Sequence, residues 1–216
     1  DFEGNGPLAP QNHRDSPGGS AIYSANTPII ANQCRFAGNI ERTKFSHGNF
    51  RTAGCVTLNG SCGGSAFTNC LWIGNCGTYG GTVNDNKIGT STNSAAVVVN
   101  LSSASSTVDF ANCTFAYNMS DSELSPTGIL MLKGKGSAVN SIFTGAVTGT
   151  CSRVANQVYV NKGSSITLDY CMFDAEGDYG AAEGGAVTAS NIMYGDPRLV
   201  YSRDDFATGG NVDLVN

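Results

Sequence analysis

One short segment recurs along this chain of 216 residues, and it constrains the possible fold more than any other feature. The segment is a cysteine, any residue and an aromatic residue. An asparagine lies one or two positions before the cysteine, and often another lies three positions after the aromatic residue. Clear copies occupy residues 32–39, 68–75 and 111–118, and weaker copies occupy 139–143 and 169–173. Self-similarity at this spacing predicts a fold of repeated units that stack on one another.

A short run of strand-forming residues, usually after glycine, lies upstream of each copy. The runs begin at residues 21, 55, 96, 128, 157 and 186, so successive starts are 34, 41, 32, 29 and 29 residues apart. No unit shows an apolar stripe at helical spacing, which disfavours folds with crossover helices. Because so small a unit cannot bury its own apolar face, each is expected to stack on the next through parallel strand pairing. The sequence therefore predicts an all-β fold, a right-handed parallel β-helix (β-solenoid) of about six coils.

Stacking the copies in register would place equivalent side chains in columns about 4.8 Å apart. The predicted aromatic column of the core is Phe36, Trp72, Phe115, Phe143 and Phe173. The predicted cysteine column is Cys34, Cys70, Cys113 and Cys171. Cysteine packs as a small apolar residue, so we interpret its column as buried thiols, although disulfides between adjacent coils also fit the geometry. A ladder of side-chain amides is predicted at a bend, formed by Asn69, Asn112 and Asn140.

The cysteine count and the glycosylation sequons bear on where the protein works. Eight cysteines, an even number, favour an oxidising compartment and therefore an extracellular location. Cys62 and Cys76 flank the Trp72 strand and are the best candidates for a disulfide. Sequons begin at Asn59, Asn100, Asn112 and Asn118, which predicts a secreted glycoprotein if the source is a eukaryote. No apolar run approaches the 18 or more residues of a membrane span.

Charge limits the chemistry that the chain can perform. Charged residues make up only 13% of the chain and the net charge is −5, which argues against nucleic acid as a partner. Calcium is the only cofactor considered, because an acidic stretch could bind it, with an ordinary acidic loop as the alternative. The stretch contains Asp174, Glu176, Asp178 and Glu183.

No catalytic residue is assigned from the sequence. Glycoside hydrolysis needs two carboxylates about 5 to 9.5 Å apart, which on stacked coils would come from equivalent positions. Asp109 and Asp169 lie four and two residues before the cysteines of their own units, so they are not expected to stack.

The repeat also defines the expected domain organisation. Residues 1–17 carry three prolines and no strand pattern, and are expected to form an N-terminal segment that caps the first coil. Residues 18–197 are expected to form the β-helix repeats. Residues 198–216 are expected to form a C-terminal tail that covers the last coil.

The repeat motifs resemble those of a known family. Gly184-Gly185-Ala186-Val187 is similar to the GGA[ILV] motif, and 36–39, 72–75 and 115–118 are similar to the FxxN motif, of the polymorphic outer-membrane proteins and related β-helix repeat proteins. Looser copies of the first motif lie at 18–22 and 63–66. The resemblance implies a non-catalytic structural or adhesive domain at the cell surface or outside the cell, with glycans, extracellular proteins or its own coil ends as partners. A secreted polysaccharide lyase or glycoside hydrolase stays open as the alternative.

Overall fold

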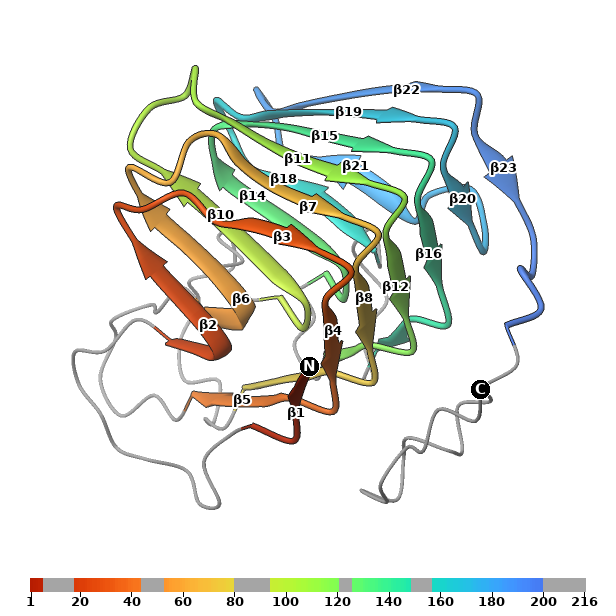
Figure 1. Ribbon diagram of the computed structural model, residues 1–216. Helices are drawn as coiled ribbons and strands as arrows, with labels where there is room; N and C mark the ends of the chain where they lie inside the picture. Colours follow the sequence, from red (N-terminus) through yellow and green to blue (C-terminus); the bar gives the residue numbers. More distant parts are fainter. Residues whose placement is uncertain (6–17, 44–52, 80–93, 121–125, 149–156, 200–216) are drawn as a thin grey trace.

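The computed structural model describes residues 1–5, 18–43, 53–79, 94–120, 126–148 and 157–199. Within these ranges the chain is all-β, with parallel strands and no helix. The strands form four sheets, which the chain visits in a fixed order before it starts again one level further along (Figure 1). In the last two coils the described residues add no strand to the fourth sheet. The result is a β-solenoid-like stack of six successive coils.

Each sheet collects the equivalent strands of successive coils. The first sheet contains β2 (Gly18–Ala25), β6 (Ala53–Gly60), β10 (Val97–Leu101), β14 (Ile129–Lys133), β18 (Val158–Val160) and β21 (Tyr179–Ala181). The second contains β3 (Ile30–Asn32), β7 (Ser65–Thr68), β11 (Thr107–Ala111), β15 (Lys135–Val139), β19 (Ser165–Asp169) and β22 (Ala186–Ser190). The third contains β1 (Phe2–Glu3), β4 (Arg35–Ala37), β8 (Leu71–Ile73), β12 (Thr114–Ala116), β16 (Ile142–Thr144), β20 (Met172–Phe173) and β23 (Met193–Tyr194). The fourth contains β5 (Ile40–Thr43), β9 (Cys76–Tyr79), β13 (Met119–Ser120) and β17 (Val147–Thr148).

A column of aromatic rings runs through the interior along the third sheet. Its members pair in register from coil to coil and are fully buried: Phe36, Trp72, Phe115, Phe143 and Phe173. Neighbouring ring centroids are 4.7 to 4.9 Å apart and the rings lie within 13° of parallel. That separation equals the spacing of paired strands, so the backbone pairing itself sets the ring stacking.

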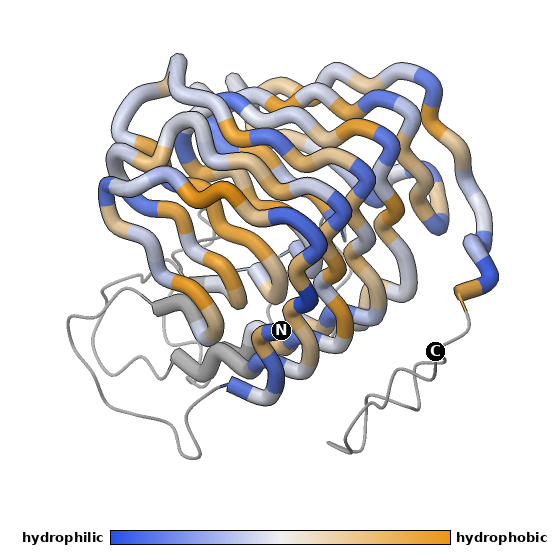
Figure 2. Tube along the Cα trace, in the orientation of Figure 1, coloured by the Kyte–Doolittle hydropathy of each residue, from blue (hydrophilic) through white to orange (hydrophobic). Residues whose placement is uncertain are grey.

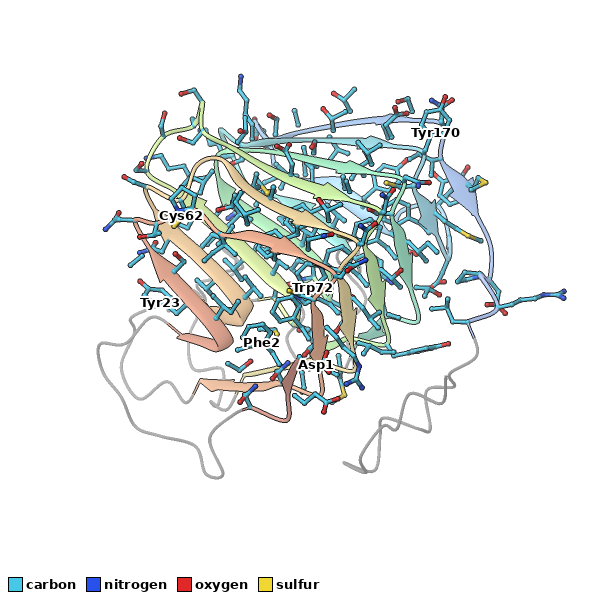
Figure 3. The ribbon with its side chains drawn as sticks, viewed as in Figure 1. Asp1, Phe2, Tyr23, Cys62, Trp72 and Tyr170 are labelled. Atoms are coloured by element: carbon cyan, nitrogen blue, oxygen red, sulfur yellow. The ribbon has the colours of Figure 1, made fainter. Side chains whose placement is uncertain are left out.

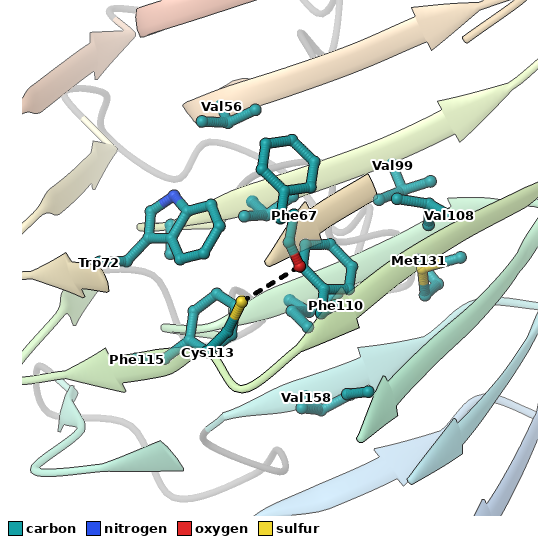
Figure 4. Close-up of a cluster of buried hydrophobic side chains, with 14 of the residues drawn as sticks. Val56, Phe67, Trp72, Val99, Val108, Phe110, Cys113, Phe115, Met131 and Val158 are labelled. Atoms are coloured by element: carbon teal, nitrogen blue, oxygen red, sulfur yellow. Dashed lines mark hydrogen bonds between the residues drawn. The ribbon is translucent and has the colours of Figure 1, made fainter. Parts of the chain in front are cut away.

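The first and second sheets complete the core (Figure 4). Phe67 and Phe110 stack on each other at 5.4 Å, and both meet the Trp72 ring edge-on. Val97 and Val99 face this interior from the first sheet, and Val98 between them is also fully buried. A central strand with both faces buried explains the uninterrupted apolar run in this part of the sequence. Where one face of a strand meets solvent, apolar and polar residues alternate along the chain (Figure 2).

The cysteine column lies beside the aromatic column. Cys70, Cys113 and Cys171 are buried and Cys34 is half-buried, while the fourth coil carries Ser141 at the equivalent position. Each buried sulfur donates to a main-chain oxygen across the interior, as from Cys113 Sγ to the Phe67 oxygen, 3.4 Å away (Figure 4). All four thiols are free, so no disulfide links adjacent coils in this column.

The expected bridge between Cys62 and Cys76 is not formed, since no disulfide is found among the described residues. Cys62 lies at the bend after β6, where its sulfur donates to the main-chain oxygens of Ser24 and Asn59. Cys76 begins β9 in the fourth sheet, on a different side of the coil. Flanking one strand in sequence therefore does not bring these two residues together.

The last coil differs from the sequence prediction. The run at residue 186 was expected to repeat the first-sheet strand, but Ala186–Ser190 is β22 of the second sheet, in register with β19. The sixth first-sheet strand is Tyr179–Ala181, which carries no strong strand signal. A pair of glycines does not identify a first-sheet strand. Gly64 and Gly184 both have positive φ, and both precede strands of the second sheet.

The two ends of the stack are described only in part. Phe2 and Glu3 form β1, which extends the third sheet beyond β4 and places the Phe2 ring 5.0 Å from Phe36. Glu3 also forms a salt bridge with Arg35. Leu199, expected to help cover the last coil, instead packs against a small apolar cluster of Ala37, Ile73 and Ala116, which belong to the first three coils. Residues 6–17 and 200–216, the remainder of the expected caps, lie outside the described residues.

Candidate functional site

The sharp bend between the second and third sheets is the best candidate for a functional surface. One residue per coil makes this turn in the left-handed region, with φ between 51° and 56°. These residues are Gln33, Asn69, Asn112, Asn140, Tyr170 and Asn191. Asparagine tolerates this conformation better than most residues, which explains why it recurs just before the core cysteine position.

Side-chain amides connect successive bends on the outside of the molecule. Asn140 Nδ2 donates to Asn112 Oδ1 at 2.7 Å, and Asn112 Nδ2 donates to Asn69 Oδ1 at 3.2 Å. Asn69 Nδ2 in turn donates to Asn32 Oδ1 at 3.1 Å. All four side chains are exposed. We call Asn32, Asn69, Asn112 and Asn140 the outer ladder. Sequence reasoning placed three of its members and missed Asn32, which lies one position earlier in its own repeat.

A second amide ladder is buried, and sequence reasoning did not assign it. We call Asn39, Asn75 and Asn118, which are at most 2% exposed, the inner ladder. Asn75 Nδ2 donates to Asn118 Oδ1 and to the main-chain oxygen of Phe36, each at 2.9 Å. Its main-chain N–H also donates to Asn118 Oδ1, at 3.0 Å. These residues are the last asparagines of the FxxN motifs, so the motif itself held the signal.

The inner ladder changes the interpretation of the sequons. Asn118 is 2% exposed and its Nδ2 donates to the main-chain oxygen of Trp72, so this amide is inaccessible to a glycosylating enzyme in the folded chain. Asn59 and Asn100 are half-buried at the ends of first-sheet strands, and Asn100 Nδ2 donates to Asn59 Oδ1 at 2.8 Å. Asn112 is exposed within the outer ladder.

The acidic stretch is not assembled as a calcium site. Asp174 accepts hydrogen bonds from Thr144 Oγ1 at 2.6 Å and the Gly145 N–H at 2.7 Å. Asp178 is buried and accepts from the Ala175 N–H at 3.0 Å. Glu176 and Glu183 are exposed. Among the residues that the structure describes, no group of three or more histidine, cysteine, aspartate or glutamate side chains is placed to hold a metal ion.

The carboxylates on the second sheet lie in different columns. Asp109 pairs in register with Ser137, whose hydroxyl donates to it at 2.6 Å. Asp169 pairs with Val139 and therefore belongs two positions further along the strands. The two carboxylates thus differ in strand position as well as in coil, and the geometry supplies no acid and base pair from one column.

Neighbouring thiols in the buried column influence each other. The Cys113 thiol, hydrogen-bonded to Cys70, lowers the pKa of Cys70 to about 6. The same hydrogen bond, together with burial, raises the pKa of Cys113. Burial also raises the pKa of Cys171. The Cys70 thiol is therefore more acidic than those of Cys113 and Cys171, although it is enclosed by the fold.

The fifth coil interrupts the outer ladder. Tyr170 occupies the bend position there, and its side chain is 59% exposed at the corner of the stack (Figure 3). In the sixth coil, Asn191 Nδ2 donates to Asp169 Oδ1 at 2.8 Å, and Ser190 Oγ donates to the same oxygen at 2.7 Å. The hydrogen bond from Asn191 has the larger effect and that from Ser190 the smaller, and together they hold the pKa of Asp169 below its ordinary value. The bend thus presents an aromatic ring beside an ionised, fixed carboxylate.

Comparison with known protein families, curated proteins and solved structures finds no match for this chain. Within the described ranges, none of the secondary structure is a helix with the length and apolar character needed to cross a membrane.

Proposed function

We propose that this chain is a right-handed parallel β-helix that acts as a rigid adhesive module outside the cell, without catalytic activity of its own. The handedness rests on the general rule that connections between parallel strands of one sheet are right-handed in about 98% of cases. All neighbouring strands here pair in parallel, and each connection within a sheet passes through the other sheets first.

The outer ladder is the observation that carries the adhesive role. Four exposed amides lie in one line along the bend, each hydrogen-bonded to the next. Their base is rigid, because the rings stacked beneath the third sheet are fully buried and in register. A straight row of identical polar groups at regular spacing suits a partner that also repeats, and several weak contacts on such a surface add up to useful affinity.

The extracellular location is supported by the FxxN and GGA[ILV] motifs, which resemble those of surface-exposed repeat proteins. Disulfides lend no support, since none is found among the described residues. The absence of a carboxylate pair in one column of the second sheet favours binding over hydrolysis at that surface.

The test measures adhesion and turnover together. Beads coated with the full chain are applied to cellulose, chitin and mucin surfaces, with albumin-coated beads as the control, and released reducing ends and unsaturated products are quantified. We expect saturable retention on at least one surface and no product release. Release of products would replace this proposal with the lyase or hydrolase alternative. Failure to adhere to all three surfaces would reject the adhesive role.

A further inference from the structure

We propose that the bend at Tyr170 is a saccharide-binding site, where the exposed ring stacks against a neutral, extended oligosaccharide and the flanking polar groups bind its hydroxyls. This inference rests on the proposed adhesive function and names the ligand class for it. It follows from the backbone conformation at Tyr170, the exposure of its ring and the polar groups on either side.

The backbone conformation at Tyr170 is costly for its residue type. Its φ is 52°, in the left-handed region, where the Cβ of an L-residue lies too close to the following carbonyl oxygen. Asparagine, with its smaller penalty, holds the equivalent bend in the neighbouring coils at Asn140 and Asn191. Tyrosine therefore replaces the residue that the turn favours, and strained residues of this kind cluster at functional sites.

Packing does not account for the strain at Tyr170. Tyr117 also has positive φ, at 53°, but its ring is half-buried. A Cβ added to Gly145 would collide with the Tyr117 ring, so that ring packs tightly against the glycine turn of the next coil. The Tyr170 side chain is 59% exposed instead. Strain combined with exposure points to a ring presented to a partner.

Polar groups flank the ring on both sides along the stack. Asn140 and Asn191 hold the same bend one coil before and one coil after Tyr170, about 4.8 Å away along the axis. The Asp169 carboxylate is fixed by Ser190 and Asn191 and retains acceptor capacity for a sugar hydroxyl. An aromatic face attracts the C–H groups of a sugar ring because it carries partial negative charge.

The charge of the surface favours a neutral ligand. Asp169 is held ionised by its hydrogen bonds, and the whole chain carries a net charge of −5. Polymers of uronic acids or sulfated sugars would be repelled by this field. An extended neutral chain can instead lie along the straight bend, with one sugar over Tyr170 and the next beside the outer ladder.

A protein partner is the competing occupant. Val139 and Met193 are 39% and 58% exposed, and their coils neighbour that of Tyr170. Tyrosine is also common at the centres of protein interfaces. We favour a saccharide because amides and a fixed carboxylate border the ring and can bind sugar hydroxyls, whereas charged residues are depleted at the centre of a protein interface.

The test uses the full chain labelled with ¹⁵N, titrated with cellohexaose, chitohexaose and xylohexaose and followed by amide chemical shifts. Tyr170→Asn removes the ring while restoring the residue that suits the bend, so this variant is expected to fold. Tyr170→Phe keeps the ring. Tyr23→Asn is the matched control, since Tyr23 is an exposed tyrosine of β2 in the first sheet.

At least one hexasaccharide should shift amides around 169–171 and 190–192 and leave those of β2 unmoved. Tyr170→Asn should weaken this binding at least about tenfold, while Tyr170→Phe and Tyr23→Asn retain it. Absence of binding by all three hexasaccharides, or unchanged binding by Tyr170→Asn, would overturn the inference.

The bead assay separates this failure from failure of the adhesive function. If the beads adhere and no hexasaccharide binds, the adhesive function stands and the saccharide site falls. If in addition beads with the unchanged chain are retained on mucin freed of its glycans and beads with Tyr170→Asn are not, the occupant is a protein. If neither beads nor hexasaccharides bind, both proposals fall.

Discussion

The inner and outer ladders use the same side chain at the same axial spacing in opposite surroundings. Asn39, Asn75 and Asn118 are buried and donate to main-chain oxygens as well as to one another. The outer ladder is exposed, and each of its amides bonds mainly to its neighbour. Water can replace the outer hydrogen bonds but not the inner ones, because a buried group without a partner loses its solvation. The inner ladder therefore holds the coils together, and the outer ladder is available for binding.

Asn75→Ala should give the largest effect in this comparison. It removes four hydrogen bonds of the Asn75 side chain, two donated by Nδ2 to the Phe36 oxygen and Asn118 Oδ1, and two accepted by Oδ1 from the main-chain and side-chain amides of Asn39. Since a hydrogen bond contributes about 1 kcal/mol net, we expect a loss of about 4 kcal/mol in the free energy of unfolding. Urea denaturation measures this loss, and a change below about 1 kcal/mol would contradict the structural role.

Tyr170→Asn should stabilise the protein by about 1 kcal/mol, because it relieves the left-handed strain and restores the ladder residue at the bend. Thermal unfolding of this variant beside Tyr170→Phe checks the prediction, since phenylalanine keeps the strain. Equal stability of the two variants would show that Tyr170 is not a costly residue at this position, and the functional argument would lose its first support.

Asn112→Gly should change stability by no more than about 0.5 kcal/mol. Glycine accepts the φ of 53° without penalty, so the variant removes the outer amide and nothing else. Its comparison with Asn75→Ala isolates the effect of burial on one side chain. A loss approaching that of Asn75→Ala would erase the distinction between the two ladders.

Asn191→Gly should produce the smallest effect, a rise in the pKa of Asp169 toward its ordinary value of 3.8, because glycine accepts the φ of 53° and the variant removes the larger of two hydrogen bonds to that carboxylate. A carboxylate with a lowered pKa stabilises the fold above its unfolded pKa, and that contribution is lost as pH falls through the folded value. The variant should therefore lose less stability on acidification below pH 4. Carbon-detected NMR titration of Asp169 follows the shift, and an unchanged pKa would show that Asn191 does not hold it.

The sequence predicted the parts of this fold that depend on a repeated residue type at a constant offset. The ring column and the outer ladder follow from one register, because each member is fixed by the backbone pairing of its own coil. Cys62 and Cys76 could not be judged in that way, since a disulfide depends on where two bends lie around the coil. The strand at Tyr179–Ala181 was missed because glycine and alanine carry little strand preference, so pairing with β18 alone defines it.

The inner ladder was missed for another reason. An asparagine in a sequence suggests a turn or a surface, and only the structure shows that Asn75 is fully buried and bonded to its neighbours. The site at Tyr170 likewise needed the backbone, because nothing in the sequence marks its φ as unusual.

The most direct test of the stacked arrangement is the set of proton–proton NOEs from the single tryptophan of the chain. The ring of Trp72 should give strong NOEs to the rings of both Phe36 and Phe115, whose centroids lie 4.9 and 4.7 Å away. These partners are 36 and 43 residues distant in sequence, so the pattern can arise only if the coils lie one above the other in register. NOEs from Trp72 to only one of these rings, or to neither, would contradict the account.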